Sequence, residues 1–130
     1  MFETLRIKLF GRQPFAKVDH KTLERIIHRE FGDRAREVEQ KLQGVTEVLP
    51  NDKNRISAAI IKLAAKDINA IDNLVEMSNN DFRDILANAE YPRCFDMGFG
   101  EIEKNKLKKI YFADWKYYQN WLNKTWHFYY

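Results

Sequence analysis

Residues 52–66 limit the fold of this chain more than any other segment, with the sequence DKNRISAAIIKLAAK. Isoleucine, leucine and alanine cover most of the circumference that this segment would have as a helix. A helix that is apolar over most of its surface usually lies at the centre of a protein. The sequence therefore predicts a central helix, which begins at Asn51 or Asp52 and is surrounded by other helices.

Amphipathic helices are predicted on both sides of this segment, because apolar residues recur at three- and four-residue spacing. The first begins at Asp19 or His20 and ends before Gly32. Asp33 is expected to cap the second, which ends near Gly44, and Asp67 is expected to cap the helix after the central one. The residues predicted to face inward are Leu23, Ile26, Ile27, Phe31, Ala35, Val38, Leu42, Ile68, Ile71, Leu74, Val75 and Ser78.

Residues 81–95, DFRDILANAEYPRCF, predict a further helix that is capped by Asn79 or Asn80 and stops at Tyr91-Pro92. Its polar side is a candidate polar site, since convergent carboxylates hold a hard cation or carry out acid–base chemistry. The alternative is a solvated helix face, on which Asp81 serves the helix N-terminus and Asp84 pairs with an arginine. The candidate polar site consists of Asp81, Asp84, Glu90 and Arg93.

The two ends of the chain are less regular. Residues 93–110 are predicted to be irregular, and a final helix is predicted from Asp114. Residues 3–10 alternate apolar and charged side chains, which favours an extended N-terminal arm. A two-stranded pairing of this arm with residues 107–112 is the alternative.

Together these patterns predict an all-α fold, a compact array or bundle of five to six helices with an extended N-terminal arm. At 130 residues the chain has the length of one domain, so residues 1–130 are expected to form a single helical domain. No apolar run approaches the roughly 18–20 residues that cross a bilayer. The N-terminus also lacks the apolar stretch of a signal peptide. A cytoplasmic protein that does not enter a membrane is expected.

Motifs for catalysis or cofactor binding are missing, so the chain is expected to be no enzyme and to hold no cofactor or metal. Glu24 and His28 stand one helical turn apart, but two ligands alone are typical of a surface ion pair. No glycine-rich phosphate loop or serine nucleophile motif occurs. The only cysteine, Cys94, follows Arg93, whose charge would lower the thiol pKa and favour a reactive thiolate. The alternative is that Cys94 is a small, buried packing residue. An enzymatic hypothesis needs Asp81, Asp84 and Arg93 to converge.

The last 21 positions contain more than half of the aromatic residues of the chain, interleaved with lysine. Tyrosine and tryptophan dominate protein interfaces, which favours a non-catalytic protein-interaction or regulatory module, with a homodimer as one form. Lysine beside aromatic rings also suits nucleic acid, which is the alternative function. The candidate interaction surface consists of Lys104, Lys106, Lys108, Lys109, Tyr117, Trp121 and Trp126.

Residues 54–93 resemble segments of small uncharacterised bacterial proteins without an assigned function. The resemblance covers about a third of the chain and includes no motif of known chemistry. It implies a bacterial, cytoplasmic setting and assigns no catalytic or binding residue.

Overall fold

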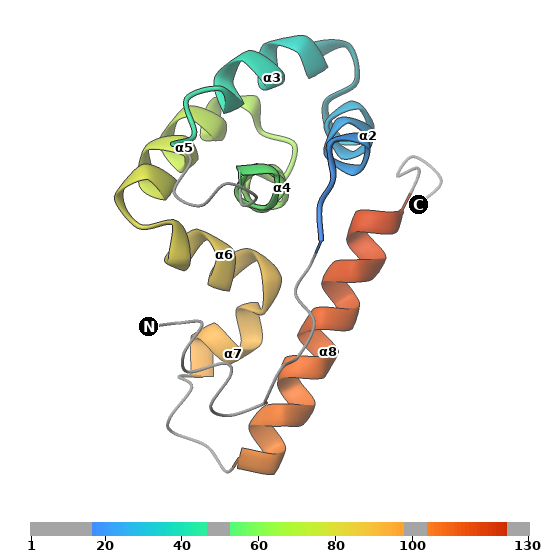
Figure 1. Cartoon of the computed structure of the whole chain (residues 1–130), viewed down its shortest axis with the longest axis vertical. Coiled ribbons are helices and arrows are strands. Elements are labelled where there is room, and N and C mark those ends of the chain that lie inside the picture. Colours follow the sequence, from blue (N-terminus) through green and yellow to red (C-terminus); the bar gives the residue numbers. More distant parts are fainter. Residues whose placement is uncertain (1–16, 47–52, 98–103, 125–130) are drawn as a thin grey trace.

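The computed structural model describes residues 17–46, 53–97 and 104–124, and every regular element in these ranges is helical (Figure 1). Among them, the α-helices of eight residues or more are α2 (His20–Phe31), α3 (Ala35–Leu42), α4 (Lys53–Ala64), α5 (Ile71–Asn80), α6 (Phe82–Glu90) and α8 (Lys104–Asn123). The short helix α7 (Pro92–Met97) and two turns of 3-10 helix, η1 (Gly32–Arg34) and η2 (Ile68–Ala70), complete the described elements. The predicted all-α array is confirmed. The N-terminal arm, residues 3–10, lies outside the described residues.

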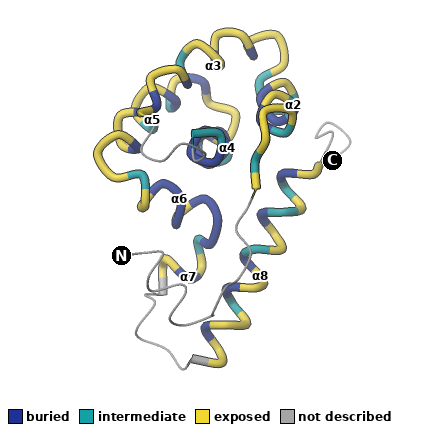
Figure 2. Tube along the Cα trace, viewed as in Figure 1, coloured by how far each residue is buried: buried dark blue, intermediate teal, exposed yellow. Residues whose placement is uncertain are grey.

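Helix α4 is the centre of this array. It packs against α2, α5 and α6, and eight of its 12 residues are buried while none is exposed (Figure 2). Ile56, Ile60 and Ile61 are at most 1% exposed, and the alanines between them allow the neighbouring helices to approach closely. The central position predicted from residues 52–66 is confirmed, whereas its predicted first residues, Asn51 and Asp52, lie outside the described ranges.

The limits of α2 follow from local chemistry. The Asp19 carboxylate accepts a hydrogen bond from the Thr22 backbone N–H at 2.8 Å, which caps the helix N-terminus. Gly32 ends the helix with φ of +52°, a conformation that glycine adopts without steric cost. The predicted cap of α3 is wrong, because Asp33 lies within the η1 turn and the N-cap position belongs to Arg34, which makes no side-chain cap bond.

The predicted cap of α6 is also wrong by one or two residues. Helix α5 continues through Asn80, and Asp81 itself caps α6 by accepting a hydrogen bond from the Arg83 N–H at 3.1 Å. Asn79 does not cap α6. Its side-chain amide donates to the Gly44 carbonyl at 2.9 Å and accepts from the Thr46 N–H at 2.7 Å. It fixes the turn after α3 to α5.

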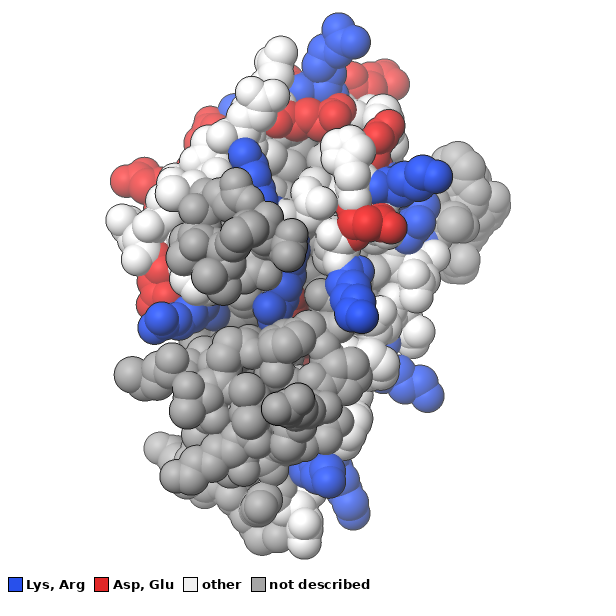
Figure 3. All heavy atoms as spheres, viewed as in Figure 1, with Lys and Arg blue, Asp and Glu red and all other residues white. Residues whose placement is uncertain are grey.

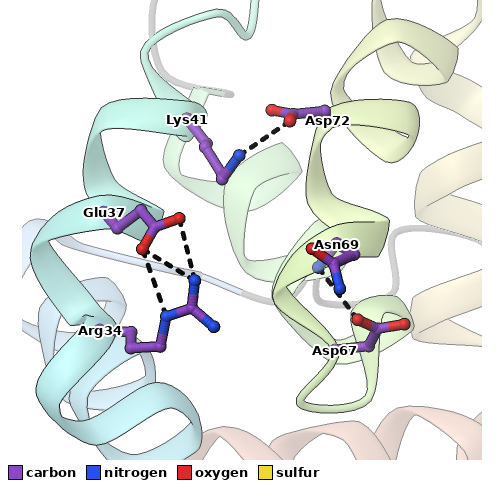
Figure 4. A network of polar contacts seen from close by, with 6 residues as sticks. All are labelled: Arg34, Glu37, Lys41, Asp67, Asn69 and Asp72. Carbon is purple, nitrogen blue, oxygen red and sulfur yellow. Dashed lines mark hydrogen bonds and ion pairs between the residues drawn. The ribbon is translucent and has the colours of Figure 1, made fainter.

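The outer surface of α3 and α5 carries exposed ion pairs (Figure 4). Arg34 bonds Glu37 on α3, and Lys41 bonds Asp72 on α5 at 2.8 Å. Exposed pairs of this kind contribute about 0–1 kcal/mol each, so the buried apolar side chains hold α3 and α5 together. Asp67 caps η2 through the Asn69 N–H, which agrees with its predicted role at the start of this segment.

Helix α8 begins at Lys104, so the prediction of a final helix from Asp114 is wrong by almost three turns. The predicted irregularity of residues 93–110 is wrong for α7 and for the first turns of α8. A pairing of residues 107–112 as a strand is likewise wrong, because they are helical. Helix α8 lies along one side of the array, where it contacts α7, α6 and α2 (Figure 1). Its buried residues are Leu107, Tyr111, Asp114, Tyr118 and Leu122.

Candidate functional site

The buried side of α8 joins two separate hydrophobic clusters. Leu107 and Tyr111 pack with Tyr91 and Cys94 in a small cluster beside α7. Tyr118 and Leu122 pack into the main core around α4. Asp114 lies between the two pairs in the sequence of α8 and is 2% exposed, so a buried charge interrupts the apolar stripe of the helix.

The Asp114 carboxylate caps α7 from outside that helix. It accepts hydrogen bonds from the backbone N–H groups of Arg93 and Cys94, at 3.1 and 3.2 Å, and from Arg93 Nε at 3.0 Å. Pro92 starts α7, and the amides of the following residues point at the carboxylate because a first helical turn has unpaired N–H groups. Arg93 therefore bonds Asp114 and neither Asp81 nor Asp84.

Arg55 and Glu90 form a second buried ionic group, between α4 and α6. Arg55 Nε and Nη2 donate to the two Glu90 oxygens at 2.8 and 2.7 Å, a bidentate geometry. The Tyr118 ring lies close to this pair, and its hydroxyl makes no hydrogen bond with the described residues. Burial raises the pKa of Tyr118 well above its ordinary value, with a further rise from the Glu90 charge.

Lys62 of α4 contacts both α6 and α8. Its ammonium donates to the Ala89 carbonyl at 2.6 Å and lies 5.4 Å from the ring centroids of both Tyr117 and Tyr118. Partial burial lowers the pKa of Lys62, and the charges of Asp114 and Glu90 oppose this effect. Lys62 therefore joins the last turn of α6 to two tyrosines of α8.

Two arginines of α2 hold the C-terminal end of α8. Arg25 donates to the Leu122 carbonyl at 2.7 Å, and Arg29 donates to the carbonyls of Trp121, at 2.7 Å, and Lys124. The Arg29 guanidinium also lies over the Trp121 ring, 4.8 Å from its centroid. The last carbonyls of a helix have no partner within it and carry its negative dipole end, so this arrangement is a charged C-terminal cap.

The candidate polar site is not assembled as one group. Asp81 and Asp84 are exposed on α6, Glu90 is 3% exposed and paired with Arg55, and Arg93 is paired with Asp114. Within the described residues no cluster of three or more metal-ligating side chains occurs. Glu24 lies 3.7 Å from His20, with both side chains largely exposed, so it takes part in a weak surface pair.

Cys94 has the surroundings of a packing residue. It is 0% exposed, and burial together with the Asp114 carboxylate raises the pKa of its thiol to about 12. The Arg93 charge acts in the opposite direction, as expected from the sequence, but its effect is the smallest. The thiol is therefore protonated at neutral pH, which opposes the reactive alternative.

The outward side of α8 contains what the structure describes of the candidate interaction surface. Tyr117 is 64% exposed and Phe112 is 38% exposed. Trp121 is half-buried, with its ring stacked on Tyr118 at 5.6 Å between centroids. The exposed lysines of α8 and its C-cap are Lys106, Lys108, Lys109, Lys116 and Lys124. Trp126 and the side chain of Lys104 lie outside what is described.

The exposed side of α8 carries no carboxylate, because Asp114 is the only acidic residue between Lys104 and Lys124 and it faces inward. In Figure 3 the lower right edge, where α8 runs, accordingly shows blue side chains without red ones. A cavity of about 440 Å³ lies at the C-terminal end of this surface, lined by Tyr117, Asn120, Trp121, Asn123 and Lys124. We call the exposed residues 105–124 of α8 and its last turn, together with this cavity, the α8 outer face.

Comparison with known protein families, with curated proteins and with solved structures found no match to this chain. The resemblance of residues 54–93 to small bacterial proteins thus stays a prediction. No helix among the described residues is both long and apolar enough to span a membrane.

Proposed function

We propose that this protein is a non-catalytic interaction module that binds an acidic protein segment through the α8 outer face. The observation that carries the proposal is the exposure of Tyr117, at 64%, among lysines on a helix face without a carboxylate. Large aromatic side chains are enriched at the centres of protein interfaces, where they contribute most of the binding energy. Phe112 and the cavity beside Tyr117 provide the apolar contacts that accompany such an anchor.

The charge of the face selects the partner. Exposed lysines at 108, 109 and 116 favour a segment rich in Asp and Glu, because complementary charge speeds encounter and rejects like-charged surfaces. The same charge disfavours a homodimer in which two α8 outer faces meet directly, since that contact would oppose lysine to lysine. An acidic partner is therefore the better-supported form of the interaction hypothesis.

Nucleic acid is the second candidate, and the same lysines favour it. The aromatic geometry supports it less well. Lys62 lies over one face of the Tyr117 ring, and Phe112 contacts Tyr111 edge to face at 6.0 Å between centroids. Base stacking requires an open ring face, and Lys62 leaves at most one face of the Tyr117 ring open for it.

Selection from a displayed library of short random peptides tests the proposal. We expect selected peptides rich in Asp and Glu around one aromatic or aliphatic residue. Tyr117→Ala should weaken their binding about tenfold or more, as for the anchor residue of an interface. Phe95→Ala is the matched control, because Phe95 is 40% exposed on α7, outside the α8 outer face.

Charge reversal tests the role of the lysines, and a second probe separates the two candidate partners. Lys108→Glu with Lys109→Glu should abolish binding of acidic peptides, whereas Lys21→Glu on α2 should leave it nearly unchanged. A single-stranded oligonucleotide is the counter-probe. Salt-sensitive binding of the oligonucleotide, without any selected peptide, would overturn the proposal in favour of nucleic acid. Peptide binding that is indifferent to Tyr117 and to both lysines would also overturn it.

A further inference from the structure

A second cavity lies on a different part of the molecule, between α2, α3 and α4. Figure 1 shows α3 at the top of the view, above α4 and beside α2. The cavity, of about 200 Å³, is lined by residues of these three helices. Its apolar walls are the buried side chains Leu23, Ile27 and Leu42. It shares no lining residue with the α8 outer face.

A buried hydroxyl group gives this cavity a polar anchor. Ser57 is 2% exposed, lines the cavity, and makes no hydrogen bond with the described residues. Ser78, the other buried serine described, instead bonds the Val75 carbonyl of its own helix at 2.7 Å. A hydrogen-bonding group that enters the cavity beside Ser57 can therefore pair with this hydroxyl.

The rim of the cavity is acidic on balance. Glu24 on α2 and Glu39 on α3 line it, against one cation, Lys53. Glu24 makes only a weak contact with the exposed His20, at 3.7 Å, and Glu39 makes no ion pair with the described residues. The two carboxylates and the ammonium together carry one net negative charge, which a single positive charge on a ligand would balance.

The volume limits the size of that ligand. A cavity of about 150 Å³ lined by apolar side chains holds benzene. The present cavity accommodates a benzene-sized group with one polar substituent. We infer that the α2–α3–α4 cavity is a binding site for a small primary amine, whose apolar body contacts Leu23, Ile27 and Leu42 and whose ammonium lies toward Glu24 and Glu39. The inference does not depend on the function proposed for α8.

Three probes of equal size and different charge test this site: benzylamine, benzyl alcohol and benzoate. Saturable binding of each is measured by titration of backbone amide chemical shifts in the full chain. We expect benzylamine to bind about tenfold more tightly than benzyl alcohol and benzoate to bind most weakly, as one favourable charge contact implies. The largest shifts should occur at Leu23, Leu42 and Ser57.

Two substitutions decide whether the binding is specific. Glu39→Gln should reduce the preference for benzylamine over benzyl alcohol, and Glu37→Gln, which removes the same charge from α3 outside the cavity, should preserve it. Ser57→Leu should fill the cavity and abolish binding of all three probes. Glu39→Gln is sufficient to test the inference if Ser57→Leu does not fold. Equal affinity for the three probes, shifts centred elsewhere, or an unchanged preference in Glu39→Gln would overturn the inference.

Discussion

Arg55 and Glu90 form a bidentate ion pair whose side chains are only 10% and 4% exposed. The pair joins α4, the central helix, to the last residue of α6. Two ions buried together lose their hydration, and this loss can equal or exceed their mutual attraction. The pair is therefore better understood as fixing how α6 lies on α4 than as a large net source of stability.

Removing one partner of this pair should be costly. Arg55→Met or Glu90→Gln leaves a buried charge without its counterion, so each should lower the free energy of unfolding by about 3–5 kcal/mol. Urea unfolding followed by circular dichroism measures the change. The double replacement of Arg55 by Met and Glu90 by Leu should restore most of the loss. Single variants that cost less than about 1 kcal/mol would show that the pair is accessible to water.

Tyr118→Phe should be neutral or stabilise the protein by up to about 1 kcal/mol. The Tyr118 hydroxyl is buried without a hydrogen bond to the described residues, and its removal deletes an unsatisfied polar group. Tyr118→Leu is the contrasting variant, because it also deletes the ring that stacks on Trp121 and lies beside Lys62. It should cost about 1–3 kcal/mol in the same unfolding experiment. A large loss in Tyr118→Phe would instead indicate that a buried water bonds the hydroxyl.

Cys94 should react with a thiol reagent only when the protein unfolds, since its side chain is 0% exposed and its pKa is raised to about 12. The raised pKa also makes stability depend on alkaline pH. Below the ordinary thiol pKa of 9.0 both states keep the proton. Between 9.0 and about 12 only the unfolded state loses it, so the free energy of unfolding falls as pH rises.

Cys94→Ala tests this linkage. The variant should lose stability with pH less steeply than the parent chain over that interval, by up to about 1.4 kcal/mol per pH unit. Its lower stability at neutral pH does not affect the comparison, because the slope is measured within each protein. Equal slopes, or rapid thiol labelling in the folded state, would contradict the buried position.

Arg29→Ala should loosen the end of α8. Arg29 is 1% exposed at its side chain and bonds two carbonyls of that helix end, so its loss should cost about 2–4 kcal/mol. Hydrogen exchange of the backbone amides at 120–124 should accelerate more than exchange in α4. Arg34→Ala is the matched control, because Arg34 forms an exposed pair with Glu37 and should cost at most about 1 kcal/mol. Similar effects of the two substitutions would refute the cap.

Local chemistry made several parts of the fold predictable. Asp19 and Gly32 limit α2 through a cap and a positive φ, and Pro92 stands two residues after the end of α6; these are effects between near neighbours in the sequence. The apolar circumference of residues 52–66 likewise determines that α4 is central. The start of α8 was not predictable in this way. Its buried positions have helical spacing, but the charge of Asp114 interrupts the apolar stripe and resembles an N-cap.

The polar contacts depended on distant residues. Glu90 lies on the apparent polar side of α6, and only the position of Arg55, 35 residues earlier, explains its burial. Asp114 was missed as a capping residue because its partners belong to a different helix. Tyr117 is exposed and Tyr118 is buried because of the side that α8 turns toward α4. Since both residues are tyrosines, their residue type could not indicate which of them is exposed.

The bonds from α2 to the end of α8 connect residues that are up to 97 positions apart. During synthesis the chain is made from its N-terminus, so Arg25 exists long before the Leu122 carbonyl that it binds. Such distant contacts also close a long loop, and their formation is slow relative to that of local helices. The contacts that fix α2 against α8 can therefore form only after the C-terminal helix has been made. In a chain that ends before residue 122, Arg25 and Arg29 would lack the carbonyl groups that they bind.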